Sequence, residues 1–443
     1  MAKRHLLMLG LLLGGGVLSS AACTDTKIIT IGDGDAGEAG DTGNHAGSGN
    51  ATSGGDAGSN SAAGEGGVGG EGGVGGEPPF VFPPSLNPQG VIVVGSAASP
   101  PSHLLVGAKD YATAGEIVSV TLASGALGDT TTYADGDVSP VSSAGLGFAV
   151  ERTNDKVHLL DGGKIDKTFD LEDLGTNHVP TGTKAYVPLY NQSLIVVLDL
   201  TTKTVSHRID LNEYNAPGDS DHSAEIAEGV YDPNSKLVYF LLQRIDLGSY
   251  DADYHLPCSK NPALIVGIDS KTDEVVDLNG SAEGKAIELE LVNPRSLSVN
   301  NDGTALYLLA DGCYEGAKKV HRGVEVVDLT EDGATTVAYV AAGADYLSSM
   351  IKTVGSEALI ESQDATSVTH WTKLDLSNGT LGAELANVPE GVSYDGTDLL
   401  GVKVTGSVGA VVRYQLATQT STVLSPTSWG GDYSFGISTA LVQ

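Results

Sequence analysis

The sequence predicts an all-β fold, and more narrowly a single seven-bladed β-propeller over residues 89–443. Val, Ile, Leu and Thr recur in short bursts between Gly, Asp and Asn turn residues, and long runs at helical i, i+3, i+4 spacing are missing. Residues 194–197 (LIVV) are apolar at every position, which predicts a strand covered on both faces. Such a strand unit, returning about every 40 residues, is typical of a blade packed between blades.

The clearest unit is residues 180–211. Residues 181–183 (TGT) predict a tight turn, and residues 184–190, 194–200 and 204–211 predict three successive strands. The most regular marker is the end of the third strand, where an apolar run meets a turn. The seven markers are residues 120–124, 159–163, 197–201, 267–271, 326–330, 373–377 and 414–418. Their middle residues are 39, 38, 70, 59, 47 and 41 residues apart, which predicts seven blades with extra residues in the fourth and fifth.

The segment GTKAYV…IVVLDLTTKTV resembles the YVTN-type seven-bladed propeller repeat. Residues 300–329 (NNDGTALYLLADG…GVEVVDL) resemble the same repeat. The resemblance covers most of residues 89–443. It rests on structural motifs, so it implies the fold rather than an activity. Pro188 departs from the pattern inside an expected interior strand, where we expect a bulge or a lost ladder bond.

A closed ring needs a last strand. Residues 432–442 read as a first strand with no blade of their own, and we expect them to pair beside residues 103–110 of blade one. Residues 90–96 compete for the same place. We expect whichever of these two segments does not pair there to cap an outer edge of a sheet.

The N-terminus predicts export. Lys3 and Arg4 precede an apolar core at residues 6–18, and residues 1–22 read as a signal peptide. Residues 20–23 (SAAC) resemble a bacterial lipobox, which implies a lipidated Cys23; the alternative is ordinary cleavage that leaves a free thiol. Residues 23–88 are Gly-rich, repeat EGGVGG, and predict a disordered tether. We therefore expect a cell-envelope protein anchored through Cys23, at the outer membrane or cell surface.

The formal net charge is −32, and 47 acidic residues face 21 basic ones after residue 79. This balance repels nucleic acid and anionic headgroups, so we expect no nucleic-acid partner and no membrane contact beyond the lipid anchor. A monomer that binds a protein or small-molecule ligand is the expected form.

Two cysteines remain after Cys23. Cys258 lies in a long insertion at residues 246–261 of blade four, and Cys313 lies at the equivalent place in blade five. Equivalent loops of neighbouring blades emerge side by side, so a disulfide is predicted ahead of a metal pair or free thiols.

Ionisable residues gather in the loops expected on one face. The predicted metal ligands are Asp219, Asp221, His222, Asp251 and Asp253, with calcium as the candidate cofactor because carboxylates on an exported loop suit it. The predicted ligand-binding residues are His178, Arg295, His255, Tyr314 and His321. The alternatives are solvated acidic loops, hydrogen-bonded histidines, and an Arg295 paired with a neighbouring acid.

The leading functional hypothesis is a non-catalytic binding or interaction platform on a lipid-anchored tether. The alternative is a lactonase- or hydrolase-like propeller enzyme, calcium-dependent, with its site on the face built by blades four and five. A third interpretation is a structural spacer. The sequence contains no G-x-S-x-G, H-E-x-x-H, C-x-x-C-H, P-loop or G-x-G-x-x-G motif after a strand, and so predicts no catalytic residue.

Overall fold

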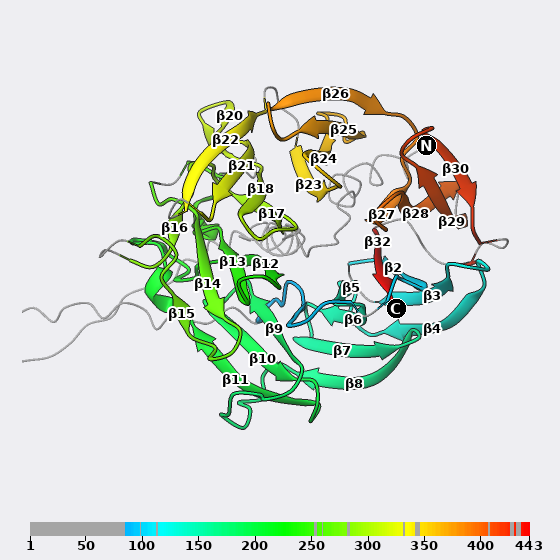
Figure 1. Ribbon diagram of the computed structural model, residues 1–443, viewed down its shortest axis with the longest axis horizontal. Helices are drawn as coiled ribbons and strands as arrows, with labels where there is room; N and C mark the ends of the chain where they lie inside the picture. The colour runs from blue at the N-terminus through cyan, green and yellow to red at the C-terminus, as the bar shows by residue number, and fades with distance from the viewer. Residues whose placement is uncertain are drawn as a thin grey trace, which may run out of the picture. The chain divides into compact units, whose positions relative to one another are not determined.

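The computed structural model of the chain describes residues 85–443, except residues 98, 112–113, 252–254, 259, 281–283, 331–332, 342–345, 406–407, 426–428 and 431–435. The predicted leader, Cys23 and most of the predicted tether lie outside the described residues. The described residues contain no α-helix, and none of their helices has the length and apolar character of a membrane span. Seven sheets of four or more strands surround a common centre and confirm the predicted all-β, seven-bladed propeller (Figure 1).

In every blade the strands run from an innermost one at the channel to an outermost one at the rim. In that order, blade one is β32 (Ile437–Val442), β2 (His103–Lys109), β3 (Gly115–Thr121) and β4 (Leu127–Tyr133). Blade two is β5 (Val138–Ser143), β6 (Leu146–Glu151), β7 (Lys156–Asp161) and β8 (Lys164–Asp170). Blade three is β1 (Ile92–Val93), β9 (Lys184–Leu189), β10 (Leu194–Asp199) and β11 (Thr204–Asp210). Blade four is β12 (Ile226–Asp232), β13 (Leu237–Leu242), β14 (Leu264–Asp269) and β15 (Val275–Val276), and β16 (Ile287–Glu288) also pairs with β14.

Blade five is β17 (Pro294–Val299), β18 (Ala305–Ala310), β21 (Gly323–Asp328) and β22 (Ala334–Val340). Blade six is β23 (Tyr346–Lys352), β24 (Glu357–Gln363), β25 (Thr369–Asp375) and β26 (Thr380–Leu385). Blade seven is β27 (Glu390–Tyr394), β28 (Leu399–Thr405), β29 (Val408–Gln415) and β30 (Thr420–Val423), with β31 (Trp429–Gly430) against β29. A two-stranded ribbon, β19 (Cys313–Glu315) and β20 (Lys318–Val320), and two short 3₁₀ helices, η2 (Asn212–Tyr214) and η3 (Leu247–Ser249), lie in the loops.

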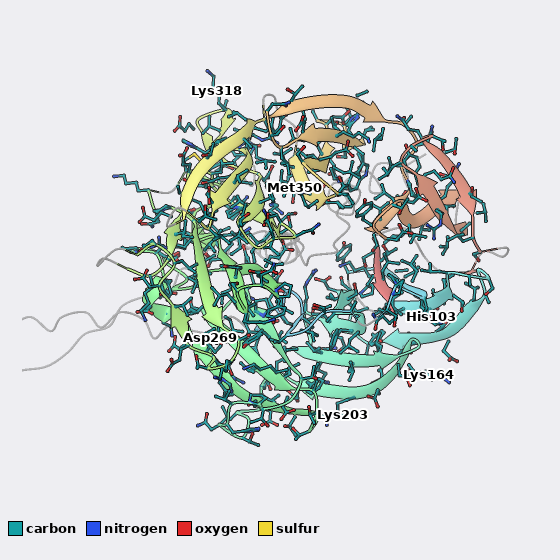
Figure 2. The ribbon with its side chains drawn as sticks, viewed as in Figure 1. His103, Lys164, Lys203, Asp269, Lys318 and Met350 are labelled. Atoms are coloured by element: carbon teal, nitrogen blue, oxygen red, sulfur yellow. A yellow bond between two sulfur atoms is a disulfide. The ribbon has the colours of Figure 1, made fainter. Side chains whose placement is uncertain are left out.

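Burial follows the position of a strand within its blade. β10 is buried at five of its six residues, as its continuous apolar run predicts, whereas β30 is exposed throughout. Figure 2 shows Lys164 and Lys203 at the outer rim of the ring and Met350 towards its centre. The inner strands therefore carry the core, and the outermost strands face solvent.

The seven predicted markers all fall at the end of a third strand. Four of them carry an aspartate whose Oδ1 accepts the N–H two residues later, which closes the turn to the fourth strand. These bonds are Asp199 to Thr201 (2.8 Å), Asp269 to Lys271 (2.7 Å), Asp328 to Thr330 (2.8 Å) and Asp375 to Ser377 (2.9 Å). The recurring aspartate is thus a turn residue, which explains why it repeats with the blades.

Seven hydrophobic clusters hold the described blades together, one at each interface between neighbours. At the junction that closes the ring, Val118 and Val120 of blade one pack with Leu400 and Val402 of blade seven. Each blade consequently buries both of its faces, which accounts for the strands that are apolar at every position.

The chain ends supply the innermost strands of two blades. β32 pairs antiparallel with β2 from His103↔Val442 to Ala108↔Ile437, which confirms the predicted closure of blade one (Figure 1). The expectation that residues 90–96 would cap an outer edge is wrong. β1 instead pairs with β9 on the inner side of blade three, through Ile92↔Tyr186 and Val93↔Ala185. Blade three has no innermost strand from the segment before β9, so the N-terminal segment occupies that position.

Pro188 does not cause a bulge. The β9–β10 register runs without a shift through Pro188↔Ile195, because the proline lacks its N–H on the opposite edge of the strand. The Pro188 carbonyl on that inner edge accepts the N–H of Gln89 at 3.0 Å. The lost ladder bond therefore falls on the side of the N-terminal segment.

Packing begins before the predicted boundary at residue 89. Asp155 of blade two accepts the Ser85 hydroxyl (2.8 Å) and the N–H groups of Leu86 (2.8 Å) and Asn87 (3.1 Å) through one carboxylate oxygen. Ser85 and Leu86 are both buried. The segment therefore leaves an anchor on blade two and enters blade three as β1.

Candidate functional site

The propeller has two faces at the ends of its central channel. We call the face with the second-to-third-strand loops and the connections between blades the loop face. We call the opposite face, with the first-to-second and third-to-fourth turns, the turn face. The sequence places every candidate site residue on the loop face.

The predicted disulfide is confirmed. Cys258 and Cys313 are bonded, with an S–S distance of 2.02 Å. Backbone bonds continue the link, because Tyr314 N–H donates to the Leu256 carbonyl (2.8 Å) and Cys258 N–H donates to the Tyr314 carbonyl (3.3 Å). The insertions of blades four and five therefore lie together on the loop face.

Two of the predicted metal ligands lie together. One carboxylate oxygen each from Asp219, Asp221 and Asp246 lies within 4.8 Å of the others. His222 is outside this group, and Asp251 is exposed and contacts His255. Asp253 lies outside the described residues.

The charge in this acidic group is poorly compensated. Burial, and then the charge of Asp221, raises the pKa of Asp219 to about 7. The same two causes raise the pKa of Glu225, which is fully buried, well above its ordinary range. Asp246 and Glu225 are the ligand candidates that sequence reasoning missed. Asp246 caps η3 by accepting the Gly248 N–H, and a capping aspartate before a short helical turn is the signal that could have identified it.

Arg295 pairs with an acid, as one of the sequence alternatives proposes. The buried Asp311 carboxylate accepts from Lys319 at 2.6 Å and lies 3.5 Å from Arg322 and 3.9 Å from Arg295. Its other contact is the Leu347 N–H of blade six, at 2.9 Å. Burial lowers the pKa of Lys319 against the opposing pull of Asp311. This group joins blades five and six at the channel end of the loop face.

The remaining predicted ligand-binding residues do not form one site. His255 stacks on Tyr314, with ring centroids 3.9 Å apart, beside the disulfide. His321 is half exposed and lies 3.7 Å from Glu315 at the end of the β19–β20 ribbon. His178 is elsewhere, because it contacts Asp199 (3.5 Å) at a third-to-fourth turn of blade three, on the turn face.

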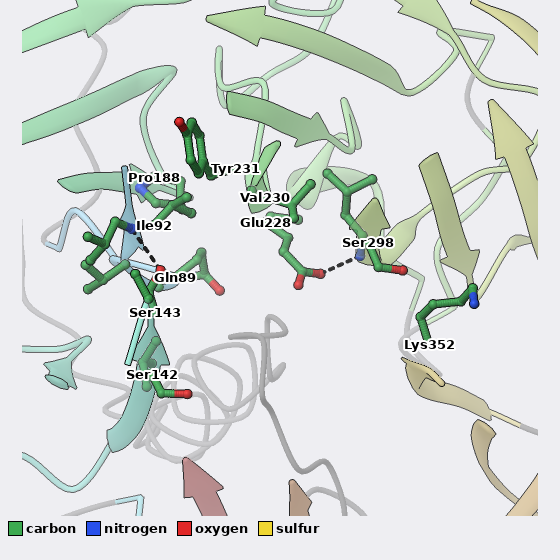
Figure 3. A pocket seen from close by; sticks show the side chains of 18 of the residues that line it. Gln89, Ile92, Ser142, Ser143, Pro188, Glu228, Val230, Tyr231, Ser298 and Lys352 are labelled. Atoms are coloured by element: carbon green, nitrogen blue, oxygen red, sulfur yellow. Dashed lines mark hydrogen bonds between the residues drawn. The ribbon is translucent and has the colours of Figure 1, made fainter. Parts of the chain in front are cut away.

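A cavity of about 480 Å³ lies in the central channel, at its turn-face end. Residues 89–93 and Gly95 form part of its wall. The carboxyl-terminal ends of β5, β12, β17 and β23 form most of the rest, and Tyr394 of β27 completes it. Figure 3 shows Glu228, Ser142, Ser143, Ser298 and Lys352 around this space. The sequence did not predict it, since strand periodicity does not report how wide a channel is.

Several polar groups around the cavity are already bonded to the backbone, and two of these bonds join neighbouring blades. Glu228 accepts the Leu297 N–H (2.8 Å), and Ser143 accepts the Val93 N–H (2.8 Å; Figure 3). Lys352 donates to the carbonyls of Thr353 (2.7 Å) and Gly355, and burial lowers its pKa. Within the described residues, the Ser298 hydroxyl is buried and has no hydrogen-bond partner. Ser142, on the inner strand β5, also lines the cavity.

No protein-family model matches the sequence, and no curated protein matches it. The YVTN resemblance therefore stays a prediction. The chain is similar to several solved structures. A putative 6-phosphogluconolactonase from Bacteroides uniformis is 15% identical, with a TM-score of 0.48 over 76% of this chain and 99% of that one. The periplasmic gluconolactonase of Pseudomonas aeruginosa is 12% identical, with a TM-score of 0.47 over 77% and 99%. TolB from Acinetobacter baumannii is 11% identical, with a TM-score of 0.43 over 76% and 66%. At these identities the similarity concerns the fold alone.

Proposed function

We propose that this chain is an exported, lipid-anchored protein of the cell envelope whose propeller is a non-catalytic binding platform. Its ligand occupies the channel cavity at the turn face. The leader, the lipobox-like Cys23 and the Gly-rich tether support the anchored form. The volume of about 480 Å³ is in the range of small-molecule sites.

One observation carries the choice of binding over catalysis. The carboxylate and the ammonium group at the cavity, Glu228 and Lys352, are bonded to backbone groups of the strands and turns. General acid–base chemistry needs such groups directed at a substrate. A wall of strand ends that carries the serine side chains of Ser142 and Ser298 suits recognition instead.

Filling the cavity tests this proposal. Sugars, amino acids and short peptides would be screened against the wild-type chain by thermal shift, and hits measured by calorimetry. Ser298→Trp is expected to weaken a cavity ligand at least tenfold, because the indole occupies its space. Ser421→Trp, on the exposed outer strand β30, is the matched control and should leave the affinity unchanged. A hit that binds both variants equally well contradicts the cavity assignment.

Mass spectrometry of the mature N-terminus tests the anchor. A diacylglyceryl-modified Cys23 is expected, and Cys23→Ala should release the protein from the membrane fraction. An unmodified Cys23 in the mature protein contradicts the anchor without affecting the cavity proposal.

The alternative is a hydrolase with its site on the loop face. The observation in its favour is Lys319, whose pKa is lowered by burial and whose Nζ lies 5.7 Å and 5.2 Å from the ring centroids of Tyr314 and Tyr346. An enzyme of this kind should hydrolyse lactones or esters and lose that activity in Lys319→Met. Absence of turnover across both substrate classes would remove it.

A further inference from the structure

Three carboxylates meet on the loop face of blade four. Asp219 and Asp221 come from the connection between blades three and four, and Asp246 begins the insertion that follows β13. They lie at the opposite end of the channel from the cavity, so they are independent of the proposed ligand site.

Local hydrogen bonds hold these carboxylates in place. Asp221 accepts the Leu247 N–H (2.8 Å) through one oxygen and the Ser223 N–H (3.0 Å) through the other. Asp246 accepts the Ser220 hydroxyl (2.6 Å). Two of these bonds cross between the connection and the insertion, so the group is fixed from both sides. Neutral donors orient the carboxylates but do not cancel their charges.

A second observation points to a ligand. The Oδ2 atom of Asp219 is buried and has no hydrogen-bond partner within the described residues, and the same is true of Oε1 of Glu225. Asp219 is 4% exposed and Glu225 is 0% exposed. The other oxygen of Glu225 accepts the N–H of Ile245, next to Asp246, at 2.9 Å. Native proteins seldom leave buried carboxylate oxygens without a donor or a cation.

Arg244 does not supply that partner. Its charge interacts with Glu225 and Asp219, but its Nη1 donates to the Pro262 carbonyl at 3.0 Å. A bound cation of another kind would supply the missing partner for these oxygens. Four carboxylates on loops, with no histidine or cysteine among them, suit a hard ion that accepts irregular oxygen geometry.

We propose that Asp219, Asp221 and Asp246 bind one calcium ion, and that the buried Glu225, which lies outside this group of three but interacts with Asp221 and Asp219, adds its charge beside the ion. The ion ties the blade three–four connection to the disulfide-linked insertion of blade four. Of the five predicted ligands, the proposal keeps Asp219 and Asp221 and omits His222 and the exposed Asp251, while Asp253 lies outside the described residues. Asp246 and Glu225 are added from the structure.

Calorimetry with calcium chloride on the chelator-treated mature protein tests the proposal. One equivalent should bind, calcium should raise the melting temperature, and the response should persist in a tenfold excess of magnesium. Asp246→Asn should weaken binding by at least the roughly tenfold that loss of an outer-shell metal partner costs. Asp251→Asn is the matched control, since it removes an exposed carboxylate from the same insertion, and its affinity should equal that of the wild type.

Glu225→Gln provides a second variant that keeps the shape of the side chain and its bond from Ile245. It should fold without calcium and show a smaller calcium-induced rise in melting temperature than the wild type. No saturable calcium binding by the folded wild type would overturn the proposal, because shared protons would then satisfy the carboxylates. Equal affinities of Asp246→Asn and Asp251→Asn, or displacement by magnesium, would overturn it as well.

Discussion

The N-terminal segment and the C-terminal strand both complete a blade, but they do so with different numbers of backbone pairs. Each provides the innermost strand of a blade that its neighbours in the sequence do not complete. β32 pairs with β2 along six residues, whereas β1 pairs with β9 along two. The N-terminal segment adds isolated bonds, such as Val94 N–H to the Lys184 carbonyl (2.9 Å), and its anchor on Asp155.

Apolar burial does not separate the two closures. Ile437, Ala440 and Val442 are buried at one end, and Val91, Ile92 and Val93 at the other. What differs is the edge that each strand covers. β2 would expose a full ladder of donors and acceptors, but Pro188 already removes a donor from the inner edge of β9. The comparison indicates that β32 closes the ring between the first and last blades, whereas β1 only adds the missing innermost strand of blade three.

The largest effect is expected from removing the C-terminal strand. Deleting residues 437–443 breaks the six-residue ladder and takes apolar side chains from the interfaces of blade one with blades two and seven. The free energy of unfolding should fall by roughly 5 kcal/mol or more, which is comparable with the whole stability of many domains. Circular dichroism melting should show an unfolded or aggregating chain. A cooperative melt within a few degrees of the wild type would contradict the assigned closure.

Removing the N-terminal strand should do less. A mature chain that begins at Ser96 loses β1 and the anchor, but β9, β10 and β11 still pack on blades two and four. A cooperative melt at a lower temperature is expected, and the channel cavity loses residues 89–95 from its wall. If this deletion unfolds the protein while the C-terminal deletion does not, the ranking of the two closures is reversed.

Sequence reasoning succeeded where one residue and its near neighbours determine the structure. Asp199 and Asp375 mark third-strand ends because their carboxylates close the next turn. Two further markers share this aspartate bond, and the seven markers together predict seven blades. The disulfide followed from equivalent loop positions. The place of residues 90–96 did not, because a two-residue strand carries no periodicity and its partner lies outside its own repeat. The sequence did not identify Asp246 and Glu225 as candidate ligands for a related reason, because they lie in two separate loops without periodicity that only the fold brings together.

Lowering the pH should break the ion pairs of Asp137 beside β2. The expected loss of stability is smaller than that of either deletion. Asp137 bonds Lys109 (2.7 Å) at the end of β2 and Arg152 of blade two (3.2 Å). Burial opposes ionisation, but these two cations prevail and lower the pKa of Asp137 from 3.8 to about 2. The ionised form therefore stabilises the fold above pH 3.8, and this contribution is lost as the pH falls through 2. The shift corresponds to about 2 kcal/mol.

Urea unfolding at several pH values measures this contribution. The difference in unfolding free energy between the wild type and Asp137→Asn should shrink as the pH falls from 5 to 2, since only the wild type loses the charge. A difference that stays constant over this range would contradict the role of the Asp137 carboxylate at the junction of blades one and two.

The smallest effect is expected at the anchor of the N-terminal segment. Asp155→Asn keeps an acceptor oxygen for Ser85, Leu86 and Asn87 but removes its charge, and asparagine tolerates the positive φ of 53° at this position. The free energy of unfolding should fall by about 1 kcal/mol, because hydrogen bonds to a charged acceptor are stronger than those to a neutral one by about this amount. Hydrogen exchange should accelerate at residues 85–94 and stay unchanged in β32. Asp161→Asn, at an exposed turn of the same blade, is the control. Faster exchange in β32 as well would mean that the two closures are coupled, because loosening one strand would then loosen the whole ring.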